Sequence, residues 1–308
     1  MTCVRVATRE SELARTQSRL VADLLEAALG VQTELVPLKT SGDRIAGSLA
    51  KVGGKGLFVK EIEEALLDGR ADLAVHSAKD LPAHQPDGLE LVAFPERADP
   101  RDALVTRKPG LTLSGLPAAA RVGTGSARRT ALLRALRSDL AVVPLRGNVP
   151  TRLRKLEEEP LDAVLLACAG LERLGLAERI GERVAPEQLL PAVAQGVLAL
   201  QGRVGDPLAR DAAVLSHAPT AARAIAERAV LQGLDADCNV PMAAYAELDD
   251  TELHLRALIA SVDGSRVLRA EARGEASEAA ALGARVAAEL LRGGGEELLC
   301  ELRREVPS

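Results

Sequence analysis

Short β-rich runs alternate with amphipathic helical runs along most of the chain, and this order restricts the fold more than any other feature. Cys3–Ala7 has the pattern of a strand, Ser11–Leu29 that of a helix ending at Gly30, and Gln32–Leu38 that of a second strand. The same unit continues with a predicted helix at Val59–Leu67 and predicted strands at Leu73–His76 and Glu90–Phe94. This alternation favours an α/β fold with a mostly parallel sheet and helices on both faces.

A second α/β unit starts near Asp99-Pro100, and a third segment with another pattern follows it. The second unit has predicted strands at Ala103–Thr106, Arg121–Gly123, Leu140–Leu145 and Ala163–Ala167, and predicted helices at Ala127–Leu136 and Thr151–Glu158. The third has a helix near Ala221–Leu231, antiparallel strands at Ala243–Leu248, Glu252–Ile259 and Arg266–Gly274, and a long helix at Ser277–Arg292 that ends in three glycines. The shared element order of the first two units predicts two similar lobes around a cleft.

The distribution of charge points to an anion site in the second unit. The chain has 308 residues, a formal net charge of −5 and only 1% aromatic residues, so nothing in the totals indicates nucleic acid, and a ligand must be held mainly by polar groups. Between Arg121 and Lys155, however, nine basic residues stand against one acidic residue, Asp139. From Asp206 to the end the balance is 11 basic against 18 acidic residues. A basic middle and an acidic tail predict an anion-binding site in the middle.

The cysteines and the apolar runs favour a cytoplasmic protein without a metal site. Cys3, Cys168, Cys238 and Cys300 lie far apart and form no C-x-x-C pair, which argues against zinc and against a disulfide framework. No signal peptide is visible at the N-terminus, and the longest apolar stretch, Ala163–Leu171, is far too short to span a membrane. We therefore expect a cytoplasmic location with reduced thiols.

Two strand-to-helix turns in the basic segment have the form of anion sites. In the turn Val122-Gly-Thr-Gly-Ser-Ala-Arg-Arg129, Ser126 can cap the following helix, and two arginines in a first helical turn are unfavourable unless an anion lies there. The alternative is a dinucleotide-binding turn, but Arg128 stands where G-x-G-x-x-G needs its third glycine. In the second turn, Arg146 follows a strand and Arg152 opens a helix, where arginines can pair with carboxylates.

Two further segments carry groups that can do chemistry. The stretch around Lys51, Lys55 and Phe58 differs from a P-loop because glycine follows the second lysine, so it is either a flexible loop over a cleft or a plain surface loop. Lys79 and Asp80 follow a predicted strand, where a carboxylate can stabilise a cation or move protons. The alternative for Asp80 is a helix cap.

Cys238 stands in the polar turn Asp235-Ala-Asp-Cys-Asn-Val-Pro241. Most lone cysteines are small buried hydrophobes, but the polar residues before this one favour exposure. Asp237 beside it is expected to raise the pKa of the thiol, which argues against a freely reactive thiolate. The local pattern alone therefore leaves a structural and a functional cysteine both open.

Read together, these segments resemble the porphobilinogen deaminase (hydroxymethylbilane synthase) family, in family order and across nearly the whole chain. The matching stretches are Ala7-Thr-Arg-Glu-Ser11, Lys51-Val-Gly-Gly-Lys-Gly-Leu-Phe58, His76-Ser-Ala-Lys-Asp80, Gly123-Thr-Gly-Ser-Ala-Arg-Arg129, Leu145-Arg-Gly-Asn148, Leu190-Pro-Ala-Val-Ala-Gln-Gly196 and Cys238-Asn-Val-Pro241. The resemblance implies two periplasmic-binding-protein-like lobes with mixed sheets and a smaller α+β C-terminal domain with an antiparallel sheet. It implies domain boundaries at 1–97 with 196–215, at 98–195, and at 216–308.

The resemblance also implies an activity and a set of site residues. The family joins four porphobilinogen molecules head to tail, with release of ammonia, on a dipyrromethane cofactor that is attached through a thioether to the cysteine matched by Cys238. Asp80 matches the catalytic aspartate, Gln195 an inter-domain position near the cleft, and Lys51, Lys55 and Phe58 a mobile loop. The groups expected to hold the carboxylates of cofactor and growing chain are Arg9, Ser11, Lys79, Ser126, Arg128, Arg129, Arg146, Arg152 and Arg173.

The resemblance implies porphobilinogen as substrate and a monomer that binds neither nucleic acid nor membrane. Two other readings of the sequence compete with it. A non-catalytic two-lobed protein for small anions would keep the arginines but would need neither Asp80 nor Cys238. A nucleic-acid binder using the basic segment is disfavoured by the acidic total and the scarcity of aromatic residues.

Overall fold

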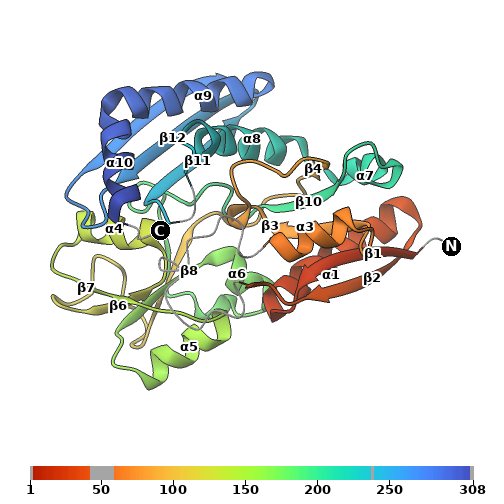
Figure 1. Ribbon diagram of the computed structural model, residues 1–308. Helices are drawn as coiled ribbons and strands as arrows, with labels where there is room; N and C mark the ends of the chain where they lie inside the picture. The colour runs from red at the N-terminus through yellow and green to blue at the C-terminus, as the bar shows by residue number, and fades with distance from the viewer. Residues whose placement is uncertain (1–2, 42–58, 237–238, 306–308) are drawn as a thin grey trace.

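A computed structural model describes residues 3–41, 59–236 and 239–305 of the chain. Two five-stranded sheets and one three-stranded sheet form its framework. Figure 1 shows how the helices are arranged around the strands. The candidate residues Lys51, Lys55, Phe58 and Cys238, together with Asp237, lie outside the described residues.

The first lobe is built on the sheet with strand order β2-β1-β3-β10-β4. Its strands are β1 (Cys3–Arg9), β2 (Gln32–Leu38), β3 (Leu73–Ser77), β4 (Leu89–Ala93) and β10 (Leu198–Arg203). Its helices are α1 (Glu12–Leu29), α3 (Lys60–Leu67) and α7 (Pro207–Ala212), with short 3-10 turns η2 (Ala78–Asp80) and η4 (Ala213–Leu215). Helix α1 starts after Ser11, which caps it, and stops at Gly30 with a φ of 65°, so both predicted ends are confirmed.

The second lobe repeats this plan with strand order β7-β6-β8-β5-β9. Its strands are β5 (Asp102–Thr106), β6 (Arg121–Thr124), β7 (Ala141–Pro144), β8 (Ala163–Ala167) and β9 (Glu182–Val184). Its helices are α4 (Ala127–Leu136), α5 (Val149–Glu158) and α6 (Cys168–Arg173), followed by the 3-10 turn η3 (Ala177–Arg179). The predicted α/β class is confirmed.

The prediction of a mostly parallel sheet is confirmed in both lobes: four strands of each sheet run in one direction, and one strand that enters from the cleft runs against them. Strand β10 begins beside the end of β3, where Leu198 pairs with Ser77, and β5 begins beside the end of β8, where Asp102 pairs with Ala167. The carboxyl ends of the parallel strands face the cleft, so a strand arriving from the other lobe must run away from it, antiparallel to its neighbours. The mixed sheets that the resemblance implied are present.

The C-terminal unit is an antiparallel sheet covered by helices. Strands β11 (Met242–Asp249), β12 (Glu252–Ala260) and β13 (Val267–Glu275) pack against α8 (Ala218–Gly233) and α9 (Ala279–Leu290). The predicted antiparallel sheet is confirmed. The long helix predicted after it is shorter: a 3-10 turn (Ala276–Glu278) precedes α9, and Gly294, with a φ of 103°, separates α9 from a further helix, α10 (Glu296–Glu305).

Two chain segments cross between the lobes, at 94–101 and 192–197, and both are fastened to the C-terminal unit. Glu227 of α8, fully buried, pairs with Arg97 of the first crossing at 2.6 Å and accepts the backbone N–H of Ala194 in the second. Gly196 has a φ of 87°, and a Cβ there would lie 2.5 Å from Ala98 O, so the two crossings touch where only glycine fits. The predicted boundaries at 97/98 and 195/196 fall within these crossings and the one at 215/216 lies just before α8; the division into domains stays a prediction.

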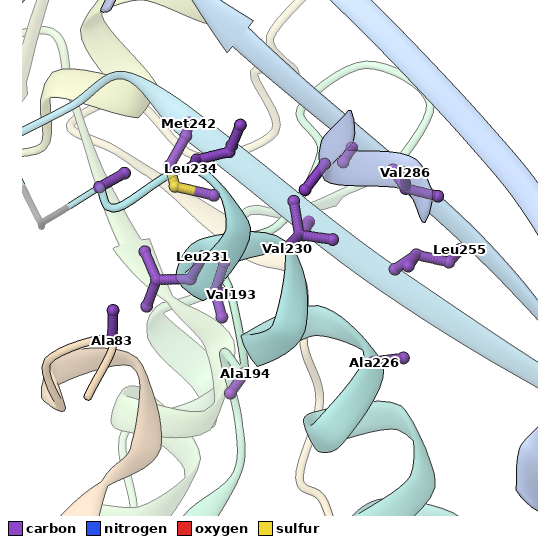
Figure 2. Packing of buried hydrophobic residues seen from close by; sticks show 14 of the residues in the cluster. Ala83, Val193, Ala194, Ala226, Val230, Leu231, Leu234, Met242, Leu255 and Val286 are labelled. Atoms are coloured by element: carbon purple, nitrogen blue, oxygen red, sulfur yellow. The ribbon is translucent and has the colours of Figure 1, made fainter. Parts of the chain in front are cut away.

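One hydrophobic core joins the three parts of the molecule. It combines Leu231 and Met242 of the C-terminal unit with Val193 and Ala194 of the second crossing and Ala83 of the first lobe. Figure 2 shows these side chains in one group around the end of α8. The segment just after η2 is therefore packed directly against the C-terminal unit.

Candidate active site

Cationic side chains from both lobes line a cavity of about 90 Å³ where the strand ends meet. Lys79 comes from η2 of the first lobe, and Arg129, Arg152 and Arg173 come from α4, α5 and α6 of the second. The volume is below the roughly 300–1,000 Å³ of ordinary ligand pockets, so this cavity has room for a small anionic group and not for a large ligand.

Arg128 and Arg129 form ion pairs with an anion of the protein itself, the carboxylate of Asp102. Asp102, at the start of β5 and fully buried, lies 2.8 Å from Arg128 Nη2 and 2.7 Å from Arg129 Nη2. Burial alone would raise the pKa of Asp102, but the two guanidinium groups and hydrogen bonds from Arg129 and Gln195 hold it well below its usual value. Arg128, 4% exposed, also donates to Leu190 O. Its contacts in the structure are internal, and none reaches the cavity.

Arg152 and Arg173 differ from that pair because, within the described residues, their side chains donate hydrogen bonds to backbone carbonyls and not to a carboxylate. Arg152 Nε donates to Gly147 O at 2.7 Å, and Arg173 Nη2 donates to Gly196 O at 2.8 Å. Burial lowers the pKa of each to about 10, and in Arg152 repulsion from Arg129 and Arg146 adds to the effect. Among the described residues neither forms an ion pair with a carboxylate. Crowded, desolvated cations of this kind gain most from a bound anion.

Lys79 connects the cavity to the buried carboxylate through Gln195. Lys79 Nζ lies 3.5 Å from Gln195 Oε1, and Gln195 Nε2 donates to Asp102 Oδ1 at 2.9 Å and to Pro100 O at 2.7 Å. Burial, opposed by Asp80 and reinforced by Arg129, lowers the pKa of Lys79 to about 8. Gln195 thus lies between the lobes, where its side chain connects Lys79 of η2 with Asp102 of β5.

Asp80 is exposed and lines a second, smaller cavity with Arg9, Gln17 and His76. The alternative of a helix cap is not what the structure shows, since η2 has no side-chain cap. His76 is buried, its Nε2 lies 2.9 Å from Gln201 Oε1, and burial lowers its pKa to about 4. A neutral histidine therefore lines the same cavity as the carboxylate of Asp80.

The two predicted serines act as helix caps. Ser126 Oγ accepts from Arg129 N at 3.4 Å, which confirms the predicted cap, and Ser11 Oγ accepts from Ala14 N at 3.3 Å. Their hydroxyl protons are left for another acceptor. Gly125 of the same turn approaches the residue that follows β7 so closely that a Cβ would lie 2.6 Å from Leu145 O. Arg146, half-buried, lies beyond that contact and close enough to repel Arg152.

Sequence reasoning missed Asp102, although it contacts three of the predicted site residues. An aspartate that opens the apolar run Ala103–Thr106 is an unusual start for a buried strand, and this was the available signal. The sequence could not show that Asp102 lies close to α4, because about twenty residues separate β5 from α4.

Comparison with known proteins agrees with the motifs. The family model described as "Porphobilinogen deaminase, dipyromethane cofactor binding domain" matches residues 4–211, and "Porphobilinogen deaminase, C-terminal domain" matches residues 221–292. In the described part of the chain, no helix has the length and apolar character to cross a membrane, and no group of metal-ligating side chains comes together.

Solved structures with a similar arrangement include two periplasmic proteins. The periplasmic VFT2 domain of Bordetella pertussis BvgS is 18% identical, covers 69% of this chain and 85% of its own, and gives a TM-score of 0.41. A periplasmic substrate-binding protein of an ABC transporter from Coxiella burnetii is 14% identical, covers 70% of this chain and 93% of its own, and gives a TM-score of 0.44. Family membership rests on the two matched models, which together span most of the sequence: the chain belongs to the porphobilinogen deaminase family.

Proposed function

We propose that the protein is a transferase that joins four porphobilinogen molecules head to tail into the linear tetrapyrrole hydroxymethylbilane, with release of ammonia. The observation that carries the proposal is the match of residues 4–211 to the cofactor-binding domain of this family, in a chain that brings Asp80 and a group of cations to one cleft. Each condensation forms one carbon–carbon bond and breaks one carbon–nitrogen bond and one pyrrole carbon–hydrogen bond, and the amino group leaves as ammonia with the proton from that carbon. After four condensations water cleaves the bond between product and dipyrromethane cofactor, and its hydroxyl group becomes the hydroxymethyl group of the product.

The cations fit a ligand rich in carboxylates. Each pyrrole of the substrate carries an acetate and a propionate arm, and Arg152, Arg173, Arg129 and Lys79 line a cavity sized for such an arm. We propose that Arg9, Arg146 and the hydroxyl groups of Ser11 and Ser126 bind further arms. Charge-assisted hydrogen bonds of this type contribute roughly 1.5–3 kcal/mol each. Arg128 would have to leave Asp102 to take part, so we assign it the role of holding Asp102 in place.

We propose that a dipyrromethane cofactor is attached through a thioether to Cys238 and supplies the pyrrole carbon at which chain growth starts. The side chains present in the described residues suit it, because the two pyrroles of such a group bring four carboxylates to a cleft with unpaired cations. The loop with Lys51, Lys55 and Phe58 is proposed to cover the cleft.

Asp80 is proposed as the catalytic carboxylate. It is exposed beside Arg9 at the carboxyl end of β3, where a substrate pyrrole can place its N–H against the carboxylate. There it stabilises the positive charge that spreads over the ring as the amino group leaves, an electrostatic effect that a preformed carboxylate supplies without reorganisation. We further propose that the protein acts in the cytoplasm as a monomer, with neither nucleic acid nor membrane as a partner, in keeping with its net charge of −5.

Intact-mass spectrometry of protein from cells supplied with porphobilinogen tests this proposal. Wild type is expected to exceed its sequence mass by one dipyrromethane, Cys238→Ser to have the sequence mass, and Cys300→Ser, a change at an exposed cysteine on α10, to keep the added mass. Asp80→Ala is expected to keep the added mass and to lose turnover. Unmodified wild type, or normal product formation by Asp80→Ala, contradicts the proposal.

A further inference from the structure

Arg228 on α8 is a buried cation that forms no ion pair with a carboxylate of the described residues. It is 5% exposed, burial lowers its pKa to about 10, and in the part of the chain that the structure describes no carboxylate forms an ion pair with it. Its Nη2 donates to Pro82 O at 2.9 Å and to Ala83 O at 3.3 Å, while its buried Nη1 has no hydrogen-bond partner among the residues that the structure describes. Burying a charge that only carbonyl groups satisfy is costly, so stability alone is a poor reason for an arginine here.

A second side chain of the same helix contacts the same backbone. Gln232, four residues after Arg228 and hence on the same face of α8, donates Nε2 to Ala83 O at 3.0 Å. Three hydrogen bonds therefore connect α8 with the carbonyl groups of Pro82 and Ala83, and both donors come from side chains.

The backbone held in this way leads directly to the reactive carboxylate. Pro82 and Ala83 follow Asp80 by two and three residues, and Ala78 and Leu81 on either side of Lys79 and Asp80 are buried in the same core as Ala83. Asp80 itself is exposed. Its position thus depends on where the flanking backbone is fixed.

The other side of the contact leads to the cysteine proposed to carry the cofactor. Helix α8 ends at Gly233, five residues before Cys238 in the sequence. Leu231, Leu234 and Ala236 belong to the core that also holds Ala83, and Figure 2 shows Ala83 facing Leu231 at the end of α8.

We propose that Arg228 and Gln232 are positioning residues for the condensation, forming a clamp on the Pro82 and Ala83 carbonyls that fixes Asp80 relative to the helix leading to Cys238. The inference rests on the proposed function. Two groups carried by different parts of the molecule must meet within a few tenths of an ångström, and an error of about 1 Å costs on the order of a hundredfold in rate.

Steady-state kinetics of the cofactor-loaded enzyme test the clamp. Arg228→Met keeps the apolar stem and removes the three-centre contact with the carbonyls; we expect kcat to fall by about tenfold to a hundredfold, with KM for porphobilinogen within about twofold and the added mass retained. Arg228→Lys, which keeps one donor, should recover part of kcat. The matched control is Arg223→Met on the same helix, because Arg223 donates to Pro219 O within α8 and not to the first lobe.

If Arg228→Met fails to fold, Gln232→Leu tests the clamp in its place. Gln232 is exposed, so the variant should fold, and the loss of its bond to Ala83 O should lower kcat by about threefold, as expected for a net hydrogen-bond energy near 0.5–1 kcal/mol. The clamp is refuted if the loaded Arg228→Met, or in its place Gln232→Leu, has the kcat of Arg223→Met. Wild type without added mass refutes the proposed function instead, so the two failures can be told apart.

Discussion

Two groups of arginines lie at or next to the same cavity and differ in their hydrogen-bond partners. Arg128 and Arg129 share the buried carboxylate of Asp102, whereas Arg152 and Arg173 donate, within the described residues, to the carbonyl groups of Gly147 and Gly196. Burial lowers the pKa of both members of the second group to about 10. We propose that pairing with Asp102 makes the first group part of the cleft wall, with Arg129 also lining the cavity, and that the second group binds ligand carboxylates. All four residues are arginines on helices of the second lobe, so their partners distinguish the two roles.

Removing the shared carboxylate should have the largest effect. In Asp102→Asn two buried guanidinium groups lose their anion, and breaking a buried pair in this way costs about 3–5 kcal/mol of unfolding free energy. Urea unfolding measures it. Asp139→Asn, which breaks an exposed pair with Arg137, is the control and should change stability little. Equal stability losses in the two variants would show that the Asp102 pairs are not a structural element.

Changing the second group should affect binding and not folding. Arg152→Met removes a cation repelled by Arg129 and Arg146, so we expect no loss of stability, but a loss of about 1.5–3 kcal/mol of ligand binding, or tenfold to a hundredfold in kcat/KM for porphobilinogen. Arg154→Met is the matched control, since Arg154 is exposed on the same helix. A variant Arg152→Met that unfolds more easily yet turns over normally would reverse the assignment of roles.

Much of this fold could be predicted because local patterns set the individual elements. The predicted bounds of Gln32–Leu38, Ala127–Leu136 and Ala163–Ala167 match the structure at every residue. The antiparallel orientation of β5 and β10 was missed. It results from the chain crossing the cleft between the lobes, and the local pattern of apolar and polar residues carries no sign of that crossing. The helix end at the three glycines was predicted, and Gly294 breaks the helix there, but the following helix α10 was missed, since a glycine run marks a helix end and not the start of the next helix.

The candidate site, like the fold, could be predicted from the sequence only in part. The turns that place Arg128, Arg129 and Arg152 at helix starts could be read from glycines and caps, and the structure has them there. Their partners could not, because the contact of Asp102 with α4 joins residues 26 and 27 apart in the sequence. An anion was expected at that helix start, but nothing local could tell an internal aspartate from a ligand.

Lys79 lies between the two groups and gives the smallest but most specific effect, a change with pH. Its pKa of about 8 means that it is a cation below pH 8 and loses its charge as pH rises through that value, so carboxylate binding should weaken there. We expect kcat/KM for porphobilinogen to fall on the alkaline side with a midpoint near pH 8, since this ratio reports the free enzyme. In Lys79→Arg the cation persists to higher pH, and the alkaline fall should move upward by at least one pH unit. Titration of the substrate's own amino group is common to both enzymes and cancels in the comparison. If kcat/KM of wild type and of Lys79→Arg falls over the same alkaline pH range, Lys79 belongs with Arg128, as part of the structure around Asp102, and not with the cations proposed to bind the ligand.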